Sequence, residues 1–142
     1  MTDDCMKTKQ EAGYRKLKVY QQAHRLALEI HKISLTLPKF ELFEEGSQIR
    51  RSSKSVSSNI VEGYSLRHYK NEYLRSLSPA YASSQETIEH LDYLYETGSI
   101  KNVESCKRLH EEYDDLCGML FNLIQSVHEK HETNIFDKQT DD

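Results

Sequence analysis

The sequence has few residues that let a chain turn and few that cross-link it. Only 5 of its 142 residues are Gly and 2 are Pro, so turns are scarce and the elements between them must be long. This scarcity excludes an all-β fold, whose short strands need frequent turns. The 3 Cys are an odd number without paired spacing. They argue against a disulfide framework and predict a reducing, cytoplasmic location.

Long apolar runs are absent as well. No stretch approaches the ~20 apolar residues of a membrane-spanning helix, and the charged first ten residues lack the apolar core of a signal peptide. The glycines stand apart from one another, so no GxGxxG or GxxxxGK[ST] phosphate loop exists. The sequence therefore predicts a soluble cytoplasmic protein that does not contact a membrane and carries no cofactor.

Helical periodicity is what the sequence has in abundance. Apolar residues recur at steps of three and four and predict helices over residues 14–37, 44–64, 66–97 and 103–127. Short connectors between long helices favour an all-α, antiparallel up-down-up-down four-helix bundle. We expect one bundle domain over residues 14–128, preceded by a flexible arm (1–13) and followed by a disordered polar tail (129–142).

The helix ends are predicted from proline, glycine and capping residues. The residue before a proline is pushed out of the α region, so Pro38 should end the first helix. Gly63 and Gly98 fit C-terminal stops of the second and third helices. N-caps are expected at Ser65 for the third helix, and at Ser99 or Asn102 for the fourth.

Two local features need separate expectations. In the connector after the first helix, Phe40, Leu42 and Phe43 should pin the chain to the core. Pro79 falls inside the third helical pattern, where it removes one backbone hydrogen bond and should bend the helix without ending it.

The second helix has an unusual composition over residues 48–63, QIRRSSKSVSSNIVEG. A thin apolar line of Ile49, Val56 and Ile60 is padded with five serines. Small side chains let a helix axis approach its neighbour closely, and the weak intrinsic propensity of this segment means that packing must hold it. We therefore expect this helix to be the central, most tightly enclosed one.

Four polar residues are candidates for a cluster between the second and third helices. Asn59 falls at an inward position, where a buried amide needs partners. Glu62 follows one turn later, and Ser83 and Glu86 lie at i, i+3 on the third helix. A buried acid–base cluster and a polar lock that fixes helix register both fit this pattern. We favour the structural lock, because no nucleophile, metal triad or oxyanion loop accompanies it, and we expect no catalytic residue.

The sequence contains pairs of possible metal ligands but no complete set. Cys106 and His110 are four residues apart and His128 and His131 three, but neither pair has a further recognisable ligand. In di-iron bundles, two helices each carry a Glu and a His three residues apart, as Glu-x-x-His. This sequence has no such repeated pair. We expect no metal site.

The formal net charge of −4 hides an uneven distribution. Residues 46–70 hold five cations against one acid, whereas residues 86–115 hold nine acids against three cations. A solvated helix face is the ordinary interpretation. Alternatively, the cations contact a phosphate backbone, or the basic face of one subunit meets the acidic face of another. The candidate phosphate contacts are Arg50, Arg51, Lys54, Arg67 and Lys70.

Three segments together resemble a known family. PKFELFEEGSQIRRSSKSVSSNIVEGY, HYKNEY and ASSQETIEHL are similar to the bacterial four-helix bundle proteins of the 23S rRNA intervening-sequence type, over about residues 14–127. The resemblance implies a left-handed bundle that assembles into a ring-shaped homopentamer and has no assigned catalytic activity. These proteins are similar to the accessory variability proteins of diversity-generating retroelements, basic pentamers that bind nucleic acid and the reverse transcriptase. The implied partners are therefore other copies of the chain, RNA or DNA, and a reverse transcriptase.

Overall fold

The computed structural model describes residues 13–130, and within this range it contains helices and no strand. The predicted all-α class is confirmed. Most of the predicted arm and tail lies outside the described residues, although α6 extends two residues into the segment predicted as a tail. The elements are a 3₁₀ turn η1 (Gly13–Lys16), four long helices α2 (Lys18–Ser34), α4 (Glu45–Ser65), α5 (Lys70–Glu96) and α6 (Val103–Lys130), and a short helix α3 (Lys39–Leu42).

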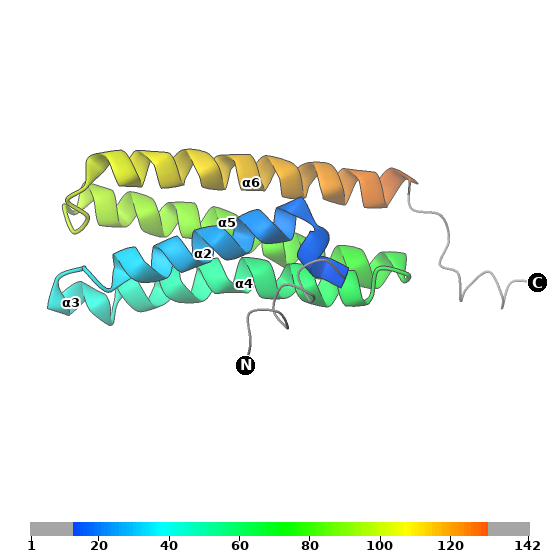
Figure 1. The fold of residues 1–142 in the computed structure, drawn as a ribbon, viewed down its shortest axis with the longest axis horizontal. Helices are drawn as coiled ribbons and strands as arrows, with labels where there is room; N and C mark the ends of the chain where they lie inside the picture. The colour runs from blue at the N-terminus through cyan, green and yellow to red at the C-terminus, as the bar shows by residue number, and fades with distance from the viewer. Residues whose placement is uncertain (1–12, 131–142) are drawn as a thin grey trace, which may run out of the picture.

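The four long helices lie side by side and each runs antiparallel to the next in the chain (Figure 1). α4 and α5 make the most extensive contact, followed by the α5–α6 and α2–α4 pairs, and α2 and α6 make the least extensive contact of the neighbouring pairs. This is an antiparallel four-helix bundle with one loose seam. α5 continues through Pro79, so the proline does not end the helix. None of the helices described here is long and apolar enough to cross a membrane.

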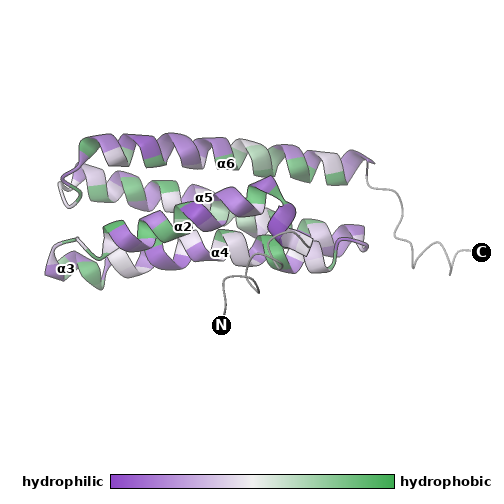
Figure 2. Ribbon diagram, in the orientation of Figure 1, coloured by the Kyte–Doolittle hydropathy of each residue, from purple (hydrophilic) through white to green (hydrophobic). Residues whose placement is uncertain are grey.

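The core is built from the apolar stripes that the periodicity predicts, and Figure 2 shows these stripes alternating with polar surface along each helix. Each fully buried aliphatic side chain contributes about 1.5–3 kcal/mol relative to an exposed one. The largest completely buried side chains come from all four long helices: Leu26, Ile30, Ile49, Val56, Ile60, Leu77, Leu91, Leu94, Leu109, Tyr113, Leu116 and Leu120.

α4 does not stop at Gly63, contrary to the prediction. The helix continues to Ser65, whose hydroxyl donates to the Val61 carbonyl at 2.9 Å instead of capping the next helix. Gly63 is buried, and a Cβ added there would lie 3.1 Å from the Ser76 Cβ and 3.2 Å from a Tyr73 ring carbon. The glycine is therefore where α5 approaches α4 closely, and composition alone does not distinguish this role from a stop.

The turn between α5 and α6 matches its prediction. Gly98 has φ +76°, and the Ser99 N–H donates to the Leu94 carbonyl at 2.9 Å. This is the bond pattern of a Schellman cap, which needs a residue that tolerates positive φ. Asn102 then caps α6, because its side-chain oxygen accepts from the Ser105 N–H at 3.1 Å. Both the Gly98 stop and the Asn102 cap are confirmed.

The connector between α2 and α4 is held by a polar contact and not by the two phenylalanines that were expected to hold it. α2 ends at Ser34, ahead of Pro38. Phe40 and Phe43 are 70% and 73% exposed, so the prediction that they pin the connector to the core is wrong. α3 instead turns Glu41 inward, where its carboxylate accepts a hydrogen bond from the Ser99 hydroxyl at 3.0 Å.

Candidate nucleic-acid interface

The structure divides the five predicted cations by their surroundings. Arg51 and Lys54 are exposed, one turn apart on α4. Arg50, predicted on the same outer face, is half-buried and turned toward the connector. Its guanidinium donates to the Leu42 carbonyl at 2.8 Å and to the Ser34 hydroxyl at 2.9 Å. Arg50 therefore fixes the end of α2 and the connector to α4.

Arg67 and Lys70 lie beyond the far end of α4. The Arg67 guanidinium sits over the Tyr64 ring, 4.0 Å from its centroid, and donates to the Tyr64 carbonyl at 3.0 Å. Lys70 is half-buried at the first position of α5. Eleven residues of helix separate Lys54 from the end of α4, about 16 Å at 1.5 Å per residue. The five cations thus form two separate groups.

Lys54 lines a groove between α2 and α4. Its ammonium lies 3.1 Å from the His31 Nδ1. Because an ammonium group can only donate, this nitrogen is the acceptor. The groove encloses about 340 Å³ and is lined by His24, Ala27, Leu28, His31, Lys54 and Ser57. Sequence reasoning missed the two histidines, although their seven-residue spacing places them on one face of α2.

The predicted polar cluster forms in part. Asn59 donates to the Ser55 carbonyl at 2.9 Å and lies 3.0 Å from the Ser55 hydroxyl. The same hydroxyl is 3.0 Å from the Ser83 hydroxyl on α5. Ser55, one turn before Asn59, is the member that sequence reasoning omitted. Glu62 and Glu86 are exposed, outside this chain of hydrogen bonds.

A second polar contact joins the same two helices. The Thr87 hydroxyl lies 2.8 Å from both the Ser52 hydroxyl and the Ser83 carbonyl. Thr87 and Ser52 are buried. Hydroxyl groups that meet across two helices favour one register, because a shift would leave the buried ones without partners. They carry no group that titrates near neutral pH.

The buried titratable groups of α6 are poorly suited to react. Burial raises the pKa of the Cys106 and Cys117 thiols, which keeps both protonated at neutral pH. Burial, reinforced by the Glu29 charge, also raises the pKa of Tyr113 well above its usual value. The Tyr113 hydroxyl has no hydrogen-bond partner among the described residues. Within residues 13–130, no three His, Cys, Asp or Glu side chains are placed to hold a metal ion.

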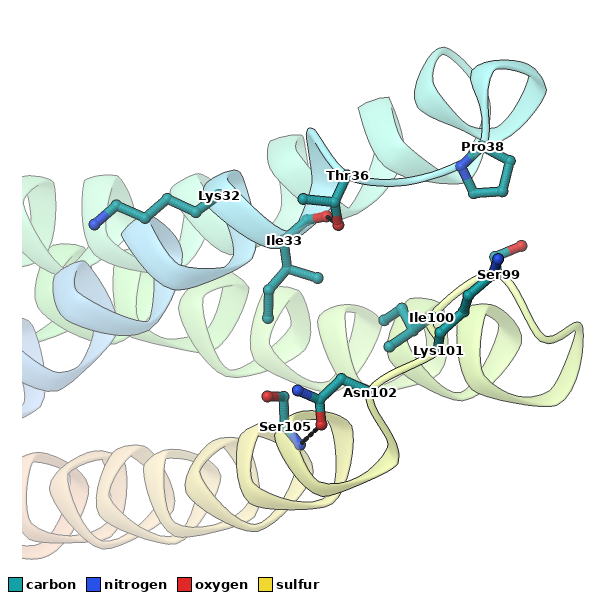
Figure 3. A pocket seen from close by; sticks show the side chains of 9 residues that line it. All are labelled: Lys32, Ile33, Thr36, Pro38, Ser99, Ile100, Lys101, Asn102 and Ser105. Atoms are coloured by element: carbon teal, nitrogen blue, oxygen red, sulfur yellow. Dashed lines mark hydrogen bonds between the residues drawn. The ribbon is translucent and has the colours of Figure 1, made fainter.

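A larger groove of about 750 Å³ opens at the end of the bundle, between the last turn of α2 and the first turn of α6 (Figure 3). Apolar side chains and hydroxyl groups share its walls, and none of the predicted phosphate contacts or members of the predicted polar cluster lines it. The lining residues are Lys32, Ile33, Thr36, Pro38, Ser99, Ile100, Lys101, Asn102 and Ser105.

Comparison with known proteins agrees with this fold. A solved structure from Bacteroides thetaiotaomicron, a protein of unknown function from the S23 ribosomal protein family, superposes with a TM-score of 0.69 at 21% identity. The match covers 75% of this chain and 95% of that one. No match was found among curated proteins. The family model described as 23S rRNA-intervening sequence protein matches residues 15–122, which is 108 of the 142 residues, and the chain belongs to that family.

Proposed function

We propose that this protein is a non-enzymatic, cytoplasmic scaffold that assembles with copies of itself and binds RNA or DNA through the exposed cations of α4. The observation that carries the proposal is the division of charge between the two halves of the bundle. Residues 13–65 hold nine cations and five acids, a formal charge of +4, and residues 66–130 hold seven cations and eleven acids, a formal charge of −4. A polyanion responds to such a local field more than to net charge.

Arg51 and Lys54 are the strongest candidates for phosphate contacts, because both are exposed on α4. Arg67 and Lys70 supply a second group at the far end of the helix. Membership of a family described by the intervening sequence of 23S rRNA supports RNA as one polyanion. The resemblance to retroelement accessory proteins supports a reverse transcriptase as a protein partner.

The same division of charge supports assembly. A molecule with one basic and one acidic half can place its basic half against the acidic half of the next copy. Contacts between two different faces close into a ring when the rotation between neighbours allows it. The homopentamer implied by the resemblance is such a ring. Phe40 and Phe43 supply exposed apolar surface within the basic half.

An RNA-binding measurement tests the proposal. We expect the full-length protein to shift a structured RNA at ~50 mM salt, with affinity falling steeply as salt rises, because phosphate contacts release counterions. Combined charge reversal, Arg51→Glu with Lys54→Glu, should abolish most of this binding. Arg75→Glu, at an exposed cation of α5, is the matched control and should retain most of it. Absence of binding at ~50 mM salt would overturn the proposal.

The charge division also favours a second candidate function, a purely structural homo-oligomer whose cations close subunit contacts. In that case the Arg51→Glu, Lys54→Glu variant should shift the mass measured by light scattering toward the monomer. Wild type and Arg75→Glu should keep the oligomer mass. An unchanged mass in the double variant, together with lost RNA binding, assigns the cations to nucleic acid.

A further inference from the structure

The N-terminal half of the bundle carries a row of aromatic rings. The Tyr14 ring meets the Tyr20 ring edge-on, with centroids 4.8 Å apart, and the Tyr20 ring lies 5.5 Å from the His24 ring at a tilt of 32°. The Arg15 guanidinium lies over Tyr14, 4.8 Å from its centroid. Tyr14, Arg15 and Tyr20 are half-buried and His24 is exposed. The row therefore places three rings and a guanidinium group in mutual contact, with His24 as its exposed member.

This row leads directly into the α2–α4 groove, because His24 belongs to both. Beyond His24 the groove continues past Leu28, which is 53% exposed, to His31 and Lys54. The contact with His31 holds the Lys54 ammonium at the groove. The ring row and the groove thus form one continuous surface, with aromatic groups at its start and the Lys54 ammonium at its end.

Packing explains only part of this surface. Tyr20 packs partly against the core, so its contact with Tyr14 fixes η1 to α2. His24 lies against Tyr20, with its Nδ1 3.4 Å from the Tyr20 hydroxyl, but this contact does not account for the exposed Leu28 beside Lys54. Exposed rings interleaved with cations are the arrangement on which unpaired bases stack while the backbone follows the positive charge.

We infer that the Tyr14–Tyr20–His24 row and the α2–α4 groove bind single-stranded nucleic acid, with bases stacked on the rings and a phosphate group at Lys54. This inference rests on the proposed function and specifies its ligand. The groove has a volume of only about 340 Å³, which holds part of a single strand and not a duplex. A duplex also keeps its bases stacked, so the rings would have nothing to bind.

Fluorescence anisotropy with the full-length protein at ~50 mM salt tests the inference. The probes are end-labelled 15-nucleotide oligo-dT and oligo-U, and a hairpin duplex of the same total length. We expect at least one single strand to bind about tenfold more tightly than the duplex. His24→Ala should weaken single-strand binding about fivefold to tenfold, the loss of one stacked base, without changing the salt dependence. Lys54→Gln should weaken it and also reduce the salt slope by about 0.7, as expected for one phosphate contact on a single strand.

Both substituted side chains are exposed, so circular dichroism should report an unchanged fold. Arg75→Gln on α5 is the matched control, and it should bind as tightly as the wild type. A duplex that binds as tightly as both single strands, with affinity insensitive to His24→Ala, overturns this inference and leaves the proposed function standing. If none of the three probes binds and structured RNA does not bind either, both this inference and the proposed function are overturned. Preference for oligo-U or for oligo-dT over the duplex supports the inference in either case.

Discussion

The contact between α4 and α5 (the α4–α5 seam) and the contact between α2 and α6 (the α2–α6 seam) are made by different kinds of side chain. α4 and α5 are the closest pair of helices, and small residues fill the contact between them. A Cβ at Gly63 would press against Ser76 and Tyr73, and the Ser52 and Thr87 hydroxyls meet at 2.8 Å in the interior. Small groups at fixed positions tolerate neither extra volume nor a shift in register, so this seam depends on shape.

α2 and α6 are the neighbouring pair with the least contact, and long charged side chains bridge them. Arg25 pairs with Glu29 at 2.9 Å and with Glu112 at 3.0 Å, and Arg108 pairs with the same two carboxylates at 2.6 and 2.7 Å. All four side chains are 27–49% exposed. Long side chains reach across a variable gap, so this seam tolerates change. The large groove opens at its end, between the last turn of α2 and the first turn of α6.

The largest expected effect is at Gly63. Gly63→Val should lower the free energy of unfolding by about 2–3 kcal/mol, because the side chain overlaps Ser76 and Tyr73 in a packed interior. Gly118→Val is the matched control: Gly118 is an exposed helical position with open space around it. The Gly118→Val substitution should raise the free energy of unfolding by a few tenths of a kcal/mol, because Val has a higher helix propensity than Gly. Urea unfolding followed by circular dichroism at one protein concentration measures both. Equal effects at the two glycines would show that the α4–α5 seam is not tightly packed.

Thr87→Val tests the polar part of the same seam. The methyl group keeps the shape, but the Ser52 hydroxyl loses its partner from α5, which should lower the free energy of unfolding by about 1–2 kcal/mol. Thr36→Val removes an exposed hydroxyl that bonds only within its own turn, and it should change stability by less than about 0.5 kcal/mol. Similar losses in the two variants would mean that the Thr87–Ser52 contact does not contribute to stability.

Tyr113 offers a contrast on the α6 side, where a buried hydroxyl lacks a hydrogen-bond partner among the described residues. Tyr113→Phe should therefore raise the free energy of unfolding by about 1 kcal/mol at pH 7. Burial raises the pKa of Tyr113, so above pH 10 the unfolded chain releases a proton that the folded chain keeps. Stability should fall as pH rises through this range. Unfolding curves at pH 7 and pH 11 should show a smaller fall in the Phe variant, and a loss of stability at pH 7 would reveal an unseen partner of the hydroxyl.

The same two seams show what the sequence could and could not predict. Periodicity identified the core positions because burial follows spacing, and the Gly98 stop and Asn102 cap depend on neighbouring residues alone. Gly63 was misjudged because a helix-breaking residue and a close-packing residue look identical without the partner helix.

The candidate site shows the same limit. The outward direction of Phe40 and the inward turn of Arg50 depend on how the connector folds back, which no local pattern encodes. Ser55 and the histidines of the α2–α4 groove were missed for a related reason. Each gains its meaning from a residue on another helix, Ser83 in the first case and Lys54 in the second.

The smallest expected effect is at the α2–α6 seam itself. Arg108→Gln removes two ion pairs, and hydrogen bonds to Glu29 raise the pKa of Arg108. The side chain is half-exposed and screened by solvent, so the loss in free energy of unfolding should stay below about 1 kcal/mol and shrink as salt is raised. Arg75→Gln breaks a single exposed pair with Glu72 and should lose less still. Urea unfolding at ~0.05 M and ~0.5 M salt measures both. If Arg108→Gln lowers the free energy of unfolding as much as Gly63→Val does, and by the same amount at both salt concentrations, the α2–α6 seam contributes as much to stability as the α4–α5 seam.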